Sequence, residues 1–328
     1  MARRTLFGTS FRRTLRTLTR VARASVKAAA EKRPAARARS RTAVPSARWI
    51  SGVAVHAGSA RRYRIFKPPG ARKGALRPLF VLLHGCDQDA AAIARSTRIR
   101  SLAAREGFIV LCPEQERLAN PQGCWNWFEM RSGRAVAEAA VIVAAIDQAC
   151  ALHGADPRRV VVAGLSAGAS LAALLGTRYP SRFAAIAMHS GVAPGAAQSA
   201  ATALRAMQGR GKLAALPTST VLPPLLVIQG STDGIVAPAN GRAAAQWWAA
   251  ASGARASAAR LVQRGKRRAA QITDFRVGKH INVTLCEIDG LAHAWSGGAA
   301  GQLYSDPAGP DATRMVWAFA ERALKAHD

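Results

Sequence analysis

The chain has 328 residues, of which 49% are hydrophobic and 20% are charged. This balance excludes a wholly disordered protein, which would combine few apolar residues with a high density of charge. Lys and Arg outnumber Asp and Glu by 47 to 18, so the formal net charge is +29. The length suits one large α/β domain or two small domains, and it is sufficient to bury a core.

The positive charge is concentrated at the beginning of the chain. Residues 1–48 hold 14 Lys and Arg against one acid, a net charge of +13. Apolar residues recur at helical spacing from Phe7 to Val26, with basic residues between them, which is typical of an amphipathic helix on an anionic interface. The composition also fits a disordered or loosely docked tail, and less well a nucleic-acid contact or an organelle-targeting segment. We therefore predict a basic extension over 1–48 and one globular domain over 49–328.

Neither a secretory signal nor a membrane-spanning segment is expected. Residues 1–45 lack the uninterrupted apolar block of a secretory signal, because Arg recurs every few positions. Glu138 and Asp147 interrupt the most apolar stretch, 135–152, whereas a spanning helix needs about 20 apolar residues. These observations favour a cytoplasmic protein.

Short apolar runs alternate with helical segments along the domain. Strands are predicted at 63–66, 79–83, 108–111, 160–163, 183–187, 225–228 and 283–288. Helices are predicted at 90–107, 135–153, 169–179 and 311–325, with a small insertion at 191–222 and a basic, solvated edge at 254–270. Strands that are buried on both faces and joined by helices form a parallel sheet. The predicted fold class is therefore α/β, a mostly parallel central sheet with helices on both faces.

A candidate nucleophile lies between the strand 160–163 and the helix that follows it. Residues 164–168 read Gly-Leu-Ser-Ala-Gly, which matches the G-x-S-x-G pattern of a nucleophile elbow. Such a tight turn needs small neighbours, and it lifts the serine hydroxyl to the carboxyl edge of the sheet. The pattern predicts Ser166 as the nucleophile and the backbone N–H of Ala167 as one donor to an oxyanion.

A serine nucleophile needs a base, which in this arrangement follows the serine and the acid along the chain. His293 follows the strand 283–288 after four residues and so occupies a loop at a strand end. His189 comes so soon after Ser166 that no acid fits between them. We therefore predict His293 as the base.

The acid that orients the base is expected between the serine and the histidine. Asp233 follows the strand 225–228, which places its carboxylate at the same sheet edge as Ser166. Its rival, Asp289, is so close to His293 in sequence that it is expected to shape the turn instead. We predict Asp233 as the acid.

The loop after the strand 79–83 is expected to supply the second oxyanion donor, the backbone N–H of Cys86. The five cysteines show no C-x-x-C or paired Cys/His spacing, so no structural zinc site is expected. The predicted chemistry needs neither a metal nor an organic cofactor.

Six motifs together resemble those of polyhydroxybutyrate (PHB) depolymerase family esterases, which are α/β-hydrolases related to bacterial feruloyl and acetylxylan esterases. They are LHGC at 83–86, CPEQ at 112–115, CWNWF at 124–128, GLSAG at 164–168, QGSTD at 229–233 and GLAHAWSGG at 290–298. The resemblance runs from about Tyr63 to the C-terminus. It implies the α/β-hydrolase fold and a triad of Ser166, Asp233 and His293. Relatives are often extracellular, with a signal peptide and a polymer-binding domain, neither of which is expected here, so the resemblance together with the sequence favours a cytoplasmic or granule-associated location.

The resemblance also bears on cysteines and tryptophans beside the predicted site. In relatives the two loops that carry Cys86 and Cys124 meet, which implies either a disulfide between them or two reduced thiols packed together. Trp125, Trp127 and Trp295 are then candidate walls of a substrate groove, or else ordinary core residues.

The function that follows is a serine esterase acting on carboxylic esters, with hydroxyalkanoate (PHB-type) oligomers or polymer as the expected substrate. A feruloyl- or acetylxylan-type carbohydrate esterase is the alternative within the same chemistry. A granule-surface or nucleic-acid-binding protein with a vestigial triad is the alternative from another class, although no specific nucleic-acid partner is expected. The intact order of Ser166, Asp233 and His293 favours the enzyme.

Overall fold

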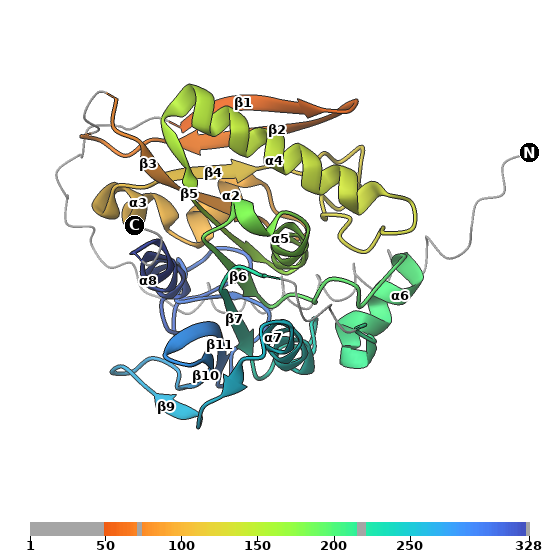
Figure 1. The fold of residues 1–328 in the computed structure, drawn as a ribbon, viewed down its shortest axis with the longest axis vertical. Helices are drawn as coiled ribbons and strands as arrows, with labels where there is room; N and C mark the ends of the chain where they lie inside the picture. The colour runs from red at the N-terminus through yellow and green to blue at the C-terminus, as the bar shows by residue number, and fades with distance from the viewer. Residues whose placement is uncertain (1–48, 71–73, 215–220, 326–328) are drawn as a thin grey trace, which may run out of the picture.

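The structure is a computed structural model that describes residues 49–70, 74–214 and 221–325 (Figure 1). The predicted basic extension over 1–48 lies outside the described residues. The strands are β1 (Trp49–His56), β2 (Ser59–Phe66), β3 (Arg77–Leu83), β4 (Ile109–Pro113), β5 (Ala155–Leu165), β6 (Ala185–His189), β7 (Leu225–Gly230), β8 (Arg255–Ala256), β9 (Arg260–Val262), β10 (Ala270–Val277), β11 (His280–Ile288), β12 (Trp295–Ser296) and β13 (Ser305–Asp306). The helices are α2 (Ala90–Ser96), α3 (Ile99–Glu106), α4 (Arg134–His153), α5 (Ala167–Arg178), α6 (Ala200–Arg205), α7 (Ala239–Ala251) and α8 (Ala312–Lys325), with short helical turns η1 (Pro180–Arg182) and η2 (Ala206–Arg210).

A mixed sheet of eleven strands forms the centre of the described domain. Its order is β1-β2-β4-β3-β5-β6-β7-β11-β10-β8, with β9 paired to β10. Neighbouring strands from β4 to β11 run parallel, and antiparallel strands extend the sheet at both ends. The parallel core confirms the predicted α/β class, and it brings the carboxyl ends of β3, β5, β7 and β11 to one edge.

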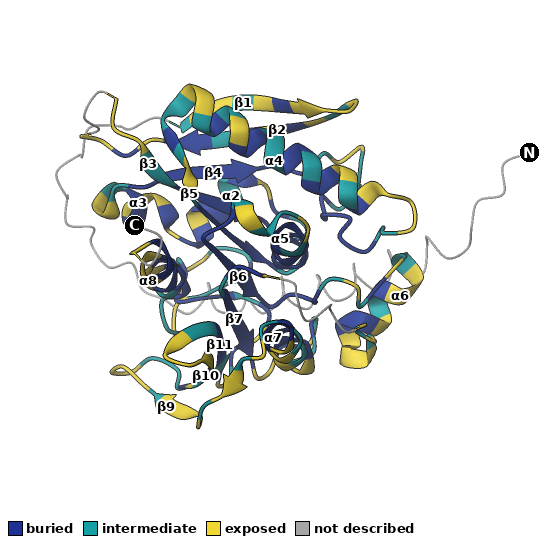
Figure 2. Ribbon diagram, viewed as in Figure 1, coloured by how far each residue is buried: buried dark blue, intermediate teal, exposed yellow. Residues whose placement is uncertain are grey.

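Helices cover both faces of the sheet (Figures 1 and 2). On one face α4, α5 and α7 enclose a core that includes Val81, and on the other α2, α3 and α8 enclose a core that includes Phe80 and Leu82. Successive side chains of a strand point to opposite faces, so β3 contributes to both cores. This double burial explains why its sequence is a continuous apolar run rather than an alternation.

Helix α4 differs from one expectation. With 20 residues it is long and apolar enough to cross a membrane by length and composition alone, although Glu138 and Asp147 led us to expect no such segment. In the fold it packs against β1, β2 and β5. Asp147 pairs with Arg182 at the surface, and the carboxylate of Glu138 is buried among hydrogen-bond donors. Helix α4 is thus part of the layer of helices that covers one face of the sheet.

Other differences between the predicted and the observed helices and strands have local causes. The predicted helix 90–107 is interrupted because Arg98 adopts φ 56°, a left-handed conformation that ends α2 and precedes α3. Strand β1 was not predicted, since most of its side chains are exposed and it shows no continuous apolar run. The basic segment 254–270 is an exposed edge as expected, but it also forms β8 and β9.

Candidate active site

The candidate nucleophile Ser166 lies in the turn between β5 and α5. Its backbone has φ 57° and ψ −118°, outside the regions that a serine normally adopts. The Ser166 N–H donates to the His189 carbonyl oxygen at 2.9 Å, which anchors the turn to β6. A Cβ on Gly168 would lie 2.4 Å from the Leu83 carbonyl oxygen, so only glycine lets α5 approach β3 this closely. The result is a strained strand–turn–helix elbow, the setting in which a serine hydroxyl is presented for attack.

Ser166 lines a hollow of about 40 Å³. Its walls are largely apolar and include Trp127, Phe128, Val192, Met207, Ile235 and Val236. Two of these, Val192 and Met207, come from the segment that the sequence indicates to be an insertion above the sheet. A single water needs about 10–15 Å³ of such space, so the enclosed part of this hollow is small. Its size suits a short acyl chain.

The structure brings Asp233 and His293 together at the carboxyl ends of β7 and β11. His293 Nδ1 lies 2.8 Å from Asp233 Oδ2, and both side chains are buried. A Cβ on Gly230 would lie 2.1 Å from the Leu291 carbonyl oxygen, so glycine is needed where the turn after β7 meets the turn before His293. Residues 60 positions apart in sequence are thereby placed in hydrogen-bond contact.

Asp233 is held as a carboxylate. Burial has the largest effect and raises its pKa, but the charge and hydrogen bond of His293 and the N–H donors of Ile235 and Val236 together lower the pKa below its ordinary value. Both of these N–H groups donate to Oδ1 at 2.9 Å, and Gln229 Nε2 donates to Oδ2 at 3.2 Å. An ionised Asp233 accepts the Nδ1 proton of His293, which leaves Nε2 as the basic nitrogen.

The rival residues are occupied elsewhere. His189 is fully buried, its Nε2 accepts the Ser296 N–H at 3.1 Å, and burial lowers its pKa to about 3. Asp289 accepts from the Ser231 hydroxyl at 3.4 Å, in the turn after β11. Neither side chain is arranged as part of a proton relay with Ser166. Within the described residues, no three His, Cys, Asp or Glu side chains gather as a group that could hold a metal ion.

Two backbone N–H groups flank the serine. In the loop after β3, the Gly85 N–H donates to Gln88 Oε1 at 3.0 Å and the Asp87 N–H donates to the Gln122 carbonyl at 2.8 Å. The N–H of Cys86 between them has no acceptor among the described hydrogen bonds. Ala167 is the first residue of α5, where backbone N–H groups have no partner within the helix. These are the two groups that the sequence predicts as oxyanion donors.

The loop that carries Cys86 is fastened at several points. A disulfide joins Cys86 to Cys124, the first of the two arrangements that the resemblance implied. His84 Nε2 accepts the Gln115 N–H at 3.0 Å, and Trp125 Nε1 donates to the His84 carbonyl oxygen at 3.0 Å. Burial lowers the pKa of His84 to about 4, so the imidazole is neutral and serves as a structural acceptor.

A buried carboxylate that sequence reasoning missed supports the same region. Glu138 of α4 accepts from Gln115 Nε2 at 2.6 Å, from the Asn126 N–H at 2.7 Å and from Asn126 Nδ2 at 2.6 Å. Arg61 Nη2 forms an ion pair with it at 3.2 Å. Gln115 Nε2 also donates to the Cys124 carbonyl at 3.0 Å. Glu138 therefore holds the loop on which the disulfide is anchored, and its only sequence signal was that of an acid interrupting an apolar helix.

The three candidate tryptophans have different surroundings. Trp127 lines the hollow beside Ser166. Trp125 is fully buried and its N–H is used by the His84 carbonyl. Trp295 is also fully buried, with its N–H donated to the Thr313 hydroxyl at 3.0 Å. Trp125 and Trp295 thus have no free surface for a substrate, which corrects their assignment as groove walls.

A serine elbow after one parallel strand, with an Asp–His pair after two others, is the arrangement of an α/β-hydrolase. The solved acetyl xylan esterase from Aspergillus awamori has the same fold, with a TM-score of 0.58 and 19% identity over 73% of this chain and 90% of that one. A family model described as Esterase PHB depolymerase matches residues 61–268. The chain therefore belongs to the PHB depolymerase family of esterases.

Two curated relatives show how far the likeness extends. Poly(3-hydroxyalkanoate) depolymerase C of Paucimonas lemoignei is 35% identical over 189 residues, which are 54% of this chain and 45% of that protein. Feruloyl esterase B of Neurospora crassa is 34% identical over 134 residues, 40% of this chain and 45% of that protein. In each case the alignment spans less than half of the relative's length.

Proposed function

We propose that the chain is a serine esterase with Ser166 as nucleophile, His293 as base and Asp233 as the orienting acid. The observation that carries the proposal is the 2.8 Å contact between His293 and Asp233, at the sheet edge where the strained elbow presents Ser166. Membership of an esterase family and the enzyme names of both curated relatives support it.

In this mechanism His293 Nε2 takes the Ser166 proton while Oγ attacks the ester carbonyl. Asp233 holds the imidazole in the required tautomer and stabilises the imidazolium that forms. The N–H groups of Cys86 and Ala167 donate to the oxyanion of the tetrahedral intermediate. His293 then protonates the departing alcohol. Water, deprotonated by His293, hydrolyses the acyl-enzyme and restores Ser166.

We further propose short hydroxyalkanoate esters as substrates. The hollow beside Ser166 has an enclosed volume of about 40 Å³ and largely apolar walls, which favours a short acyl chain. The depolymerase named among the relatives acts on a hydroxyalkanoate polymer, which supports this choice. The feruloyl esterase relative keeps a carbohydrate esterase as the second candidate, and an acetyl group would also fit the hollow.

The test compares hydrolysis of p-nitrophenyl acetate, 3-hydroxybutyrate oligomers and methyl ferulate. Ser166→Ala should lower kcat by about 10⁴-fold or more on every ester that the wild type hydrolyses. Ser132→Ala, at an exposed serine outside the hollow, is the matched control and should retain full activity. Absence of wild-type hydrolysis would leave the surface-binding alternative, and preference for ferulate would overturn the substrate class.

The extension 1–48 is proposed to govern location rather than catalysis. Its net charge of +13 suits an anionic membrane or granule surface. Deleting it should leave turnover of soluble esters unchanged while abolishing sedimentation with anionic vesicles.

The Cys86–Cys124 disulfide bears on the compartment in which the protein works, because such bonds persist mainly in oxidising compartments. It therefore favours an extracytoplasmic location over the cytoplasmic one that the sequence suggested.

A further inference from the structure

A second hollow, of about 410 Å³, shares no lining residue with the one beside Ser166. It lies where β1 and β2 meet α2, α3 and the segment between β12 and β13. Its volume falls in the range of about 300–1,000 Å³ that is typical of small-molecule sites. We call it the arginine hollow, because its lining contains no Asp or Glu and four arginines: Arg64, Arg95, Arg98 and Arg100.

The positive charge of the arginine hollow is largely unbalanced. Arg98 forms an ion pair with Asp311 at 3.3 Å. Across the residues that the structure describes, no ion pair involves Arg64, Arg95 or Arg100. Like charges that share one concave site repel each other. An anion with two or more charges would remove this repulsion.

Two of the guanidinium groups are held in place by aromatic rings. The Arg64 guanidinium lies 5.4 Å from the centre of the Trp49 ring, and that of Arg100 lies 5.7 Å from the centre of the Phe66 ring. Stacking orders an arginine side chain through its planar face and leaves its N–H groups at the edge free to donate. Part of the entropy lost when a ligand is bound is thus already lost in the free protein.

The beginning of α3 contributes to the same hollow. Arg98 occupies the position before the helix, and Arg100 and Ser101 lie in its first turn. This turn contains no acidic residue, and no side chain caps its free N–H groups. A helix start carries partial positive charge, which adds to that of the arginines.

We propose that the arginine hollow binds a small anion that carries a diphosphate group. Guanidinium forks match phosphate oxygens in geometry and donate two hydrogen bonds each, and they do so better than an ammonium group does. A diphosphate offers several acceptor oxygens at once, which the three arginines of this hollow without an ion pair could share. The chemistry is shared by free pyrophosphate and by the diphosphate of a nucleotide.

Calorimetric titration of the full-length protein with pyrophosphate tests the proposal, in about 0.15 M salt so that diffuse surface attraction is screened. Wild type should bind saturably. Arg64→Gln and Arg100→Gln should each weaken binding by about tenfold or more, because each removes charge-assisted hydrogen bonds. A parallel titration with ADP distinguishes the two sources: tighter binding of ADP identifies a nucleotide, and equal or weaker binding identifies the free anion.

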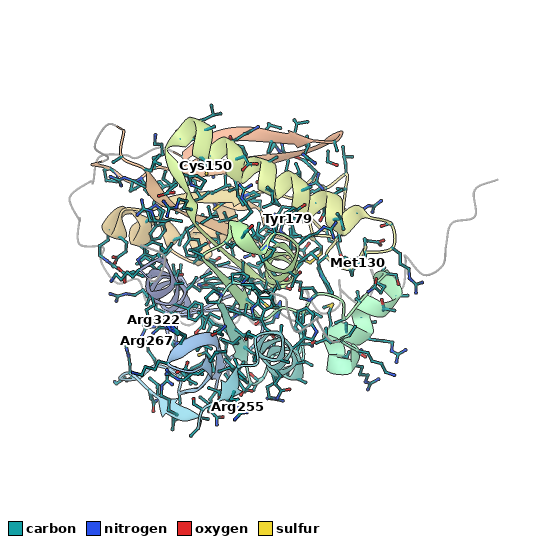
Figure 3. The ribbon with its side chains drawn as sticks, viewed as in Figure 1. Met130, Cys150, Tyr179, Arg255, Arg267 and Arg322 are labelled. Carbon is teal, nitrogen blue, oxygen red and sulfur yellow. A yellow bond between two sulfur atoms is a disulfide. The ribbon has the colours of Figure 1, made fainter. Side chains whose placement is uncertain are left out.

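Arg322→Gln is the matched control. Arg322 lies on α8 (Figure 3), and its guanidinium is 5.7 Å from the Phe319 ring, the same distance as in the Arg100–Phe66 pair. It does not line the arginine hollow. Loss of affinity in Arg322→Gln equal to that in Arg100→Gln would show that binding follows overall charge and would overturn the proposal. The absence of saturable pyrophosphate binding by the wild type would overturn it as well.

Discussion

Acid should destabilise this protein through two buried histidines. His84 and His189 have no exposed surface to speak of, at 0% and 1%, and each imidazole accepts a backbone N–H. Burial lowers the pKa of His84 to about 4 and that of His189 to about 3. In the unfolded chain both return to the ordinary value of about 6.5.

The size of the effect follows from proton linkage. Because the unfolded chain binds these two protons more tightly than the fold does, protonation below about pH 6.5 favours unfolding. Above that pH both states are neutral and the free energy of unfolding does not respond to these groups. Near pH 5 each histidine costs about 2 kcal/mol, and together about 4 kcal/mol, by linkage between the two pKa values. That is a large part of the roughly 5–15 kcal/mol by which domains are stable.

Urea unfolding followed by tryptophan fluorescence, at several pH values between 7.5 and 5, measures this loss. His189→Gln keeps a side-chain acceptor for the Ser296 N–H but cannot titrate, so its stability should fall about 2 kcal/mol less than that of the wild type over this range. His280→Gln, at an exposed position on β11, should follow the wild type. A wild-type stability that is flat between pH 7.5 and 5 would refute the assignment of both imidazoles as buried and neutral.

Three further predictions concern the loops around Ser166. Replacing Cys86 and Cys124 by Ser opens a link across 38 positions and should lower the free energy of unfolding by up to about 4 kcal/mol, read from the urea midpoint; an unchanged midpoint would contradict a formed disulfide. Glu138→Gln should cost about 3–5 kcal/mol, because it leaves Arg61 as a buried charge without its partner, and calorimetry that shows no loss would contradict the buried ion pair. Met207→Ala should enlarge the hollow and raise the ratio of kcat/KM for p-nitrophenyl hexanoate over acetate by about tenfold or more, whereas an unchanged ratio would show that Met207 does not limit acyl length.

The parts of the fold that the sequence predicted well are those where each residue is constrained locally. β3 is buried on both faces, so its apolar run is unambiguous. The elbow at Ser166 needs a glycine at 168, because a side chain there would collide with the backbone of β3. This requirement is visible in the sequence as the G-x-S-x-G motif. β1 is an edge strand with exposed side chains at most positions, and its place depends on pairing with β2, which no local pattern reveals.

The candidate site likewise contains residues whose roles could be predicted from the sequence and residues whose roles could not. Asp233 and His293 were predictable because parallel strands end at one edge, so residues far apart in sequence meet whenever each follows its strand. The role of Glu138 was not, since its partners lie 77, 23 and 12 positions away and an acid in an apolar helix indicates only an interruption. Spacing also failed to separate Trp127, which faces the hollow, from Trp125, which does not.

The Asp–His pair and the oxyanion donor of the proposed site are therefore held in place by different contacts. Mutations that loosen one and not the other should have different effects on the kinetics. Asp233 and His293 stand on strand ends fixed by the sheet, whereas the Cys86 N–H stands on a loop fixed by a disulfide and by the contacts of Glu138. Loosening the loop should leave the Asp–His pair intact and remove a hydrogen bond that forms only as the oxyanion develops. Removing one oxyanion donor lowers kcat by about 10²–10³-fold. Opening the disulfide should therefore lower kcat by up to that factor, with little change in KM. A rise in KM at constant kcat would instead place the loop in substrate binding and remove Cys86 from the proposed oxyanion hole.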